Sequence, residues 1–103
     1  MEIRQFKLLD LIQTEKNQLT AKLEIDKIIR DVQVDFQYFE SDFYGFQLPE
    51  DIQIILRNYP RLSQKVISCF GDYLKQKSLL LPIDFSILVQ RQNIAAQMEK
   101  QAA

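Results

Sequence analysis

The sequence contains no histidine, and this absence removes several classes of function. Histidine is the commonest general acid–base side chain and the commonest nitrogen ligand of metal ions. Serine and cysteine triads that depend on histidine are therefore excluded, as is a phosphorelay domain that carries its phosphoryl group on histidine. With a single cysteine, Cys69, the chain also lacks the ligands of the ordinary structural zinc sites.

Glycine is nearly as scarce, and Gly45 and Gly71 lie far apart. A dinucleotide fingerprint or a phosphate-binding loop needs several glycines close together, so neither is present. No stretch has the alternating Asp/Asn pattern of a calcium-binding loop. We therefore expect no catalytic, cofactor-binding or metal-binding residues and no enzymatic activity. A carboxylate-dependent enzyme, in which two of the fourteen acidic residues meet in space, is the remaining catalytic alternative.

The lone cysteine and the N-terminal residues bear on the compartment. Small secreted domains usually carry several cysteines, whereas Cys69 has no partner for an internal disulfide. Its apolar neighbours Val66, Ile67 and Phe70 predict a thiol packed as a small hydrophobic group. The chain begins without the basic and apolar regions of a signal peptide, and residues 78–83 are far shorter than the ~18 apolar residues of a membrane span. These features predict a cytoplasmic protein without a membrane partner.

Length and composition are those of one globular domain over residues 1–103. The 47% of hydrophobic residues and 26% of charged residues are ordinary globular values. A chain of this length can bury a hydrophobic core without disulfides or metal ions. We expect it to fold by itself.

Alternating apolar and polar residues in the first half predict β-strands. Residues 19–25 alternate strictly, and residues 32–39 alternate again with the opposite parity. The change of parity falls at Asp26–Lys27 and requires a turn or a bulge, because the apolar face would otherwise flip. Helical spacing of some apolar residues between 21 and 39 leaves a helix as the alternative.

Residues 3–12 have no clear period, since their apolar side chains spread around the whole helical circle. The segment is either a strand covered on both faces or a deeply buried helix. The polar residues 13–18 then predict a hairpin loop to the next strand. Together these segments predict an antiparallel meander over about residues 3–39.

The second half has helical patterns interrupted by prolines. Pro49 followed by Glu50 and Asp51 is typical of a helix start, Pro60 interrupts the pattern, and Asp84 after Pro82 could cap a last helix. These signals predict helices over about 49–59, 61–76 and 85–100. The expected fold is therefore α+β, with the meander packed against two or three C-terminal helices, and an all-α bundle is the alternative.

Six of the eleven aromatic residues fall between positions 36 and 46, around two acidic residues. In one interpretation they fill the core between sheet and helices, and 41–45 is the connecting turn. In the other they form an aromatic and acidic surface for a partner protein, since aromatic residues are enriched among interface anchors. The candidate interface residues are Phe39, Glu40, Asp42, Phe43, Tyr44 and Phe46.

The net charge of −1 conceals an uneven distribution, which could steer a partner. Residues 31–56 hold six acids and no Lys or Arg, whereas residues 57–103 hold seven bases and three acids. Arg57, Arg61 and Lys65 recur every four residues and could form a basic helix face. A sequence pI of about 5.4 disfavours nonspecific nucleic-acid binding. The basic face could instead contact the acidic segment of a second copy, as a homo-oligomer.

These observations favour a small accessory or regulatory protein that acts by binding another protein, such as an inhibitor, an immunity factor, a chaperone or a complex subunit. A nucleic-acid-binding regulator that uses Arg57, Arg61 and Lys65 is the first alternative, and the carboxylate-dependent enzyme is the second. No motif is specific enough to identify a family, and the sequence does not identify the partner.

Overall fold

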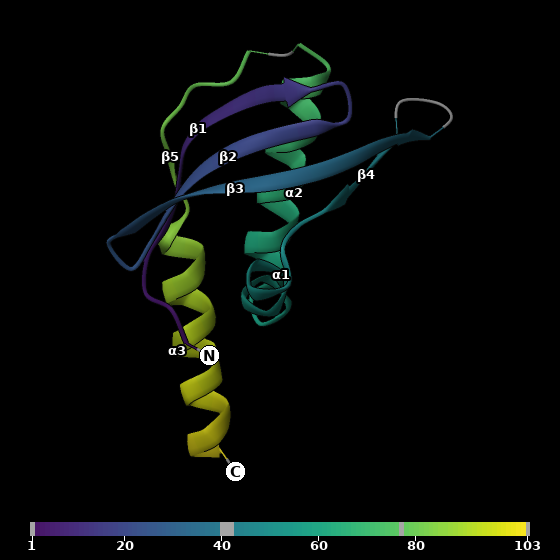
Figure 1. Cartoon of the computed structure of the whole chain (residues 1–103). Helices are drawn as coiled ribbons and strands as arrows, with labels where there is room; N and C mark the ends of the chain where they lie inside the picture. The colour runs from purple at the N-terminus through teal and green to yellow at the C-terminus, as the bar shows by residue number, and fades with distance from the viewer. Residues whose placement is uncertain (1, 40–42, 77, 103) are drawn as a thin grey trace.

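The computed structural model describes residues 2–39, 43–76 and 78–102 and has an α+β fold. A five-stranded antiparallel sheet has the order β4-β3-β2-β1-β5, and three helices follow the first four strands (Figure 1). The predicted N-terminal meander and C-terminal helices are confirmed, and the all-α alternative is wrong. The strands are β1 (Phe6–Glu15), β2 (Gln18–Ile25), β3 (Ile28–Phe39), β4 (Phe43–Gln47) and β5 (Ile83–Asp84), and the helices are α1 (Glu50–Arg57), α2 (Pro60–Leu74) and α3 (Ser86–Ala102).

The turn predicted at Asp26–Lys27 joins β2 to β3. Ile25 pairs with Ile28, so the loop has two residues, and both have positive φ angles, 50° for Asp26 and 72° for Lys27. This is the geometry of a type I′ hairpin turn, whose twist matches that of the flanking strands. The turn reverses the parity of the chain, so that Leu23 of β2 and Val32 of β3 both face the core.

The irregular pattern of residues 3–12 has a different cause from the one expected. From Phe6 onward the segment belongs to β1, and the register of β1 with β2 shifts between Leu8 and Asp10. The extra residue at this β-bulge changes which side chains face inward: Phe6 and Leu8 are buried before the shift and Leu11 after it, whereas Ile12 is exposed. The prediction of a strand covered on both faces is therefore wrong. The simple alternation of apolar and polar residues is lost because of the bulge.

The segment after β3 also differs from the prediction. Residues 41–45 were expected to form the connecting turn, but Phe43 to Gly45 belong to β4, which pairs with the end of β3 (residues 41 and 42 lie outside the described residues). Phe43 pairs with Phe39 and Gly45 with Gln37. The rings of Phe36 and Phe46, which pair across the two strands with centroids 6.4 Å apart, stabilise this strand despite its glycine.

Two prolines set the helix boundaries. Pro49 is the N-cap residue of α1, and Glu50 and Asp51 occupy its first turn, where they are favoured by the positive end of the helix dipole. Pro60 is the first residue of α2. The N–H at this position has no acceptor within the helix, so a proline here costs no helical hydrogen bond. Helix α3 continues to Ala102, through the glutamine-rich end of the sequence.

Helix α2 lies across one face of the sheet, whereas most of α3 extends away from the sheet (Figure 1). The core lies between this face and the helices. Phe70 and Val66 of α2 and Ile52 of α1 are buried against inward-facing residues of the strands. The opposite face is mostly polar, with Ile12, Ile29 and Phe39 among its exposed apolar residues, and carries an ion pair between Lys7 and Glu24 (3.6 Å). None of the helices in the described ranges has a stretch long and apolar enough to cross a membrane.

A candidate protein-interaction surface on the β3–β4 hairpin

The β3–β4 hairpin carries two exposed aromatic side chains. The ends of its strands extend past α2, away from the helical layer (Figure 1). Tyr38 is 59% exposed and Phe39 is 48% exposed. Because successive side chains of a strand point to opposite faces, this end of the hairpin presents an aromatic residue on each face.

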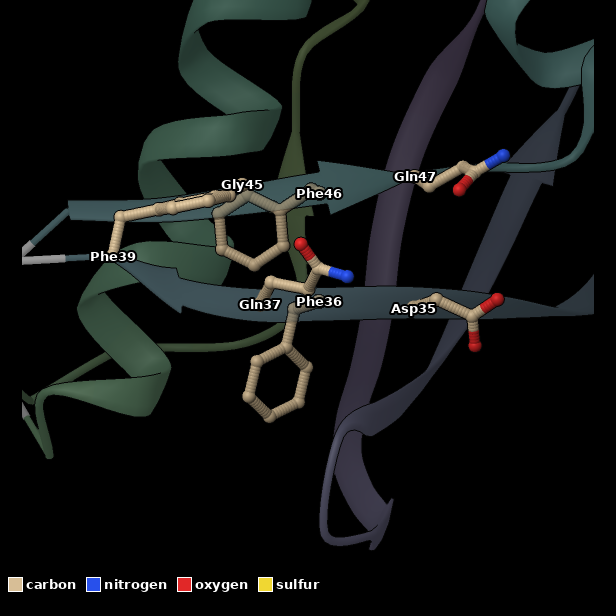
Figure 2. Close-up of a pocket in the computed structure, with 7 residues that line it drawn as sticks. All are labelled: Asp35, Phe36, Gln37, Phe39, Gly45, Phe46 and Gln47. Carbon is tan, nitrogen blue, oxygen red and sulfur yellow. The ribbon is translucent and has the colours of Figure 1, made fainter.

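Phe39 packs over Gly45 on the face of the sheet that the helices leave open. A Cβ atom at position 45 would lie 2.8 Å from Cε2 of Phe39, which is closer than a van der Waals contact. Gly45 therefore lets the ring lie flat along β4, as Figure 2 shows. An aromatic side chain that covers a cross-strand glycine is a known device for stabilising β-sheets.

The hairpin carries a shallow groove with two neighbouring parts. The first, with a volume of about 240 Å³, lies between Phe39 and Gly45 at one end and Asp35 and Gln47 at the other (Figure 2). Its remaining lining residues are Gln37, Phe36 and Phe46. The second, of about 380 Å³, shares Asp35 and Gln47 and continues to Glu50 at the start of α1. We call them the aromatic part and the acidic part of the hairpin groove.

Strand β4 forms one edge of the described sheet. The N–H of Phe36 bonds to the carbonyl oxygen of Asn17 on the β2 side (2.9 Å), so even-numbered residues of β3 direct their main-chain groups toward β2. Odd-numbered residues of β3 direct theirs toward β4. Since Tyr38 pairs with Tyr44, the main-chain N–H and C=O of Tyr44 point away from β3, toward the outer side of the edge.

The predicted interface residues are divided between different environments. Phe39 lies on the open face, whereas the Phe46 ring packs on the helical side, 5.5 Å from the Phe70 ring centroid and 6.4 Å from that of Phe36. The backbones of Phe43 and Tyr44 are part of β4. Glu40 and Asp42 lie outside the described residues. Phe46 thus packs against the core, as in the first interpretation, whereas the surface for a partner protein at the exposed Phe39 stays a prediction.

The predicted basic face is divided as well. Arg57, Arg61 and Lys65 are all exposed. Arg57 lines a groove with Phe46 and Ile67, beside β4. Arg61 lines a separate groove between α2 and α3, together with Arg91. The break at Pro60 therefore directs the first two arginines into different grooves, and only Arg61 and Lys65 share a continuous helix.

Hydrogen bonds lower the pKa values of two carboxyl groups. A hydrogen bond from Arg30 lowers the pKa of Asp51, and hydrogen bonds from Ser86 lower the pKa of Asp84. Both side chains are exposed. Within the described ranges, no three acidic or cysteine side chains gather in the way that a metal ion requires.

Sequence reasoning missed several residues of this surface. Asp35 was predicted only as part of a strand, Gln47 was not assigned, and Tyr38 was placed in the aromatic cluster but outside the candidate interface. The signal that could have identified them is Gly45 between aromatic residues, which is typical of a strand whose glycine is covered from the neighbouring strand. With β4 recognised, the register alone places Asp35, Gln37 and Phe39 on one face.

Comparison of the chain with protein-family models, with curated proteins and with solved structures found no match.

Proposed function

We propose that this chain is a small accessory or regulatory protein of the cytoplasm that binds another protein through its β3–β4 hairpin, without catalysing a reaction. The observation that carries the proposal is the exposure of Tyr38 and Phe39 (59% and 48%) on a hairpin end that extends past the helices. Adjacent large aromatic side chains in solvent are typical of interface anchors, because burying them excludes much water at a small entropic cost.

Three further observations support the proposal. Phe39 lines a groove, and both exposed aromatic residues lie beside the edge strand β4, so shape and main-chain hydrogen bonding are available near one another. The surrounding segment is acidic, which would steer a basic partner. Cys69 is a buried free thiol, as is common for a protein kept in a reducing compartment.

The test compares two variants that remove exposed apolar side chains from opposite ends of β3. Tyr38→Ser with Phe39→Ser alters the hairpin, and Ile28→Ser with Ile29→Ser alters a similarly exposed pair (67% and 56%) beside the β2–β3 turn. Each variant and the unmodified chain are used as tagged bait in native lysate, and stoichiometric partners are quantified by mass spectrometry. Circular dichroism and thermal unfolding show that each bait is folded.

We expect the unmodified chain to recover one or a few partners and the Ile28/Ile29 variant to recover nearly the same amount. The Tyr38/Phe39 variant should recover at least tenfold less. A loss of about 1.4 kcal/mol of binding free energy gives such a tenfold change. Recovery that depends on Ile28 and Ile29 instead would assign the interface to the opposite end of the strand. If no stoichiometric partner is recovered, including a second copy of the chain, the proposal is wrong.

A further inference from the structure

We propose that the hairpin surface binds an extended segment of the partner protein as an added strand beside β4, and that a lysine or arginine of this segment lies in the acidic part of the hairpin groove. The inference rests on the proposed function and names the chemistry of its partner. It requires three properties of the surface: an available sheet edge, a cation-binding part, and a fixed spacing between the two parts of the groove.

The first property is the geometry of the edge. No described strand lies on the outer side of β4, and the N–H and C=O of Tyr44 point to that side. An extended segment placed there could exchange two main-chain hydrogen bonds with Tyr44 and would continue the antiparallel or parallel ladder. Edge strands with such groups are templates for pairing unless charges, prolines or bulges block them. Strand β4 contains no proline and no charged residue.

The second property is charge complementarity. The acidic part of the groove is lined by two acidic residues and three glutamines, together with Leu48 and Pro49. The polar lining residues are Asp35, Glu50, Gln33, Gln47 and Gln53. Among the described residues, no Lys or Arg lines either part of the groove. Asp35 accepts a hydrogen bond from Nε2 of Gln18 (3.2 Å), and the nearby Arg30 forms an ion pair with Asp51. An ammonium or guanidinium group would supply the missing positive charge and donate to carboxylates and amide oxygens.

The occupant is therefore a basic segment rather than a second copy presenting the same hairpin. Residues 31–56 carry six acids and no Lys or Arg, so two copies that met through β4 would bring like charges together. A neutral or acidic segment would leave the carboxylates of Asp35 and Glu50 without a cation at the interface.

The third property is the spacing of the two parts. Gly45 lies beside the aromatic part, and Gln47 borders the acidic part, two residues further along β4. Two strand residues span about 7 Å and return to the same face of the sheet. An added strand would thus present alternate side chains to the two parts. The segment is expected to carry an apolar residue against Phe39 and a basic residue two positions away.

The experiment selects binders from a phage-displayed library of random linear peptides against the intact chain. The expected consensus has Lys or Arg two positions from an apolar residue. A synthetic peptide of that consensus is then titrated by fluorescence anisotropy against the unmodified chain, the Asp35→Asn/Glu50→Gln double variant, and Asp31→Asn as a control on the same strand and face. We expect the double variant to bind about tenfold more weakly and the control within about twofold.

A second pair of variants tests strand addition separately. Tyr44→Pro removes the outward N–H, whereas Tyr44→Ala keeps it, and both lose the same aromatic ring. Weaker peptide binding by Tyr44→Pro than by Tyr44→Ala, at equal thermal stability, supports pairing along the edge. Equal binding by the two variants would overturn it.

The inference is also overturned if the library yields no binder, if the consensus lacks a basic residue, or if the double variant binds the peptide normally. In each of these cases the proposed function is judged independently by lysate capture with the Tyr38/Phe39 variant. Loss of the cellular partner in that variant, without any peptide binding, would leave the hairpin as an interface for a folded partner.

Discussion

The hydroxyl of Tyr59, at the junction of α1 and α2, donates a 2.7 Å hydrogen bond to Oδ1 of Asn93 in the middle of α3. The same hydroxyl accepts a hydrogen bond from the N–H of Ile3 (3.0 Å), and Nδ2 of Asn93 donates to the carbonyl oxygen of Ile3 (2.8 Å). Three segments that lie far apart in the sequence thus meet in one closed set of hydrogen bonds. Because Tyr59 and Ile3 are buried, these bonds are shielded from competing water.

Removing this hydroxyl should destabilise the fold. Tyr59→Phe leaves the buried N–H of Ile3 and one oxygen of Asn93 without their partner, and we expect the free energy of unfolding to fall by about 1–2 kcal/mol in urea titrations. Tyr73→Phe is the matched control, since the Tyr73 hydroxyl accepts its bond from an exposed N–H of Gln13 (3.1 Å). The control should lose less than about 0.5 kcal/mol, and an equal loss in both variants would contradict this account.

The two residues of the β2–β3 turn should respond differently to glycine. Lys27→Gly relieves a positive φ of 72° and should raise the free energy of unfolding by about 0.5–1 kcal/mol. Asp26 also has a positive φ, but its carboxylate accepts hydrogen bonds from the N–H groups of Arg4 (2.7 Å) and Gln5 (2.8 Å). We therefore expect Asp26→Gly to destabilise the protein. Chemical denaturation of both variants distinguishes turn geometry from the side-chain contribution.

Gly45→Ala should separate the shape of the hairpin from its stability. The new Cβ atom displaces the Phe39 ring, which is half-exposed, while alanine is a better strand residue than glycine. These effects oppose each other, so we expect a change in unfolding free energy within about 0.5 kcal/mol. Aromatic ring resonances in NMR spectra should nevertheless shift for Phe39. A large loss of stability would show that the ring cannot move.

The Asp84 carboxylate should make stability depend on pH below its ordinary pKa of 3.8. Its Oδ1 accepts a hydrogen bond from the N–H of Ser86 at the start of α3 (2.9 Å), and the bonds from Ser86 lower its pKa in the folded protein. The ionised group is therefore stabilising above the unfolded-state value, and this stabilisation is lost as the pH falls through the folded-state value.

Asp84→Asn keeps an oxygen that can accept the same hydrogen bond but carries no charge near the α3 N-terminus. We expect the free energy of unfolding at pH 7 to be higher for the unmodified chain than for this variant. The difference should be only a few tenths of a kcal/mol, because the carboxylate is exposed and its charge is screened. The difference should vanish near pH 2. Thermal unfolding of both proteins across this range measures it, and a difference that stays constant with pH would assign the effect to packing rather than charge.

Cys69 should be unreactive in the folded protein. Burial raises the pKa of its thiol, and the nearby Asp72 carboxylate raises it further. We expect Ellman's reagent to modify Cys69 on the order of a hundredfold more slowly than in urea, where the thiol is exposed. Rapid modification under native conditions would show that α2 opens locally and would contradict the prediction of a packed thiol.

The sequence predicted the elements whose patterns are local. Alternation in β2 and β3 and the prolines before α1 and at the start of α2 reflect forces between near neighbours, and the structure confirms these elements. The β-bulge in β1 was missed because an extra residue at Leu9 mixes two parities within one short segment. Strand β4 was missed because its glycine and aromatic residues resemble a turn until β3 is placed beside it.

The candidate surface was predictable only in part. Phe39 was selected for its place among aromatic residues, but nothing local distinguishes it from Phe46, which the register of β4 turns toward Phe70. The acidic part of the groove brings Asp35 together with Glu50 across the β4–α1 connection. Such a relationship depends on tertiary packing, so composition and spacing do not contain it.

The short strand β5 has a consequence for the order in which the molecule comes apart. Strands β1 to β4 follow one another as neighbours, whereas β5 pairs Lys7 with Asp84 and Leu8 with Ile83 across about 75 residues of chain. The start of α3 is held beside β5, because the N–H of Phe85 donates to the carbonyl oxygen of Phe6 and Val89 is fully buried. Residues 94–99 of α3, beyond Asn93, are exposed, so we expect this end of the helix to unfold locally first as the protein is warmed. Amide hydrogens of residues 94–99 should exchange with solvent well before those of β2 and β3.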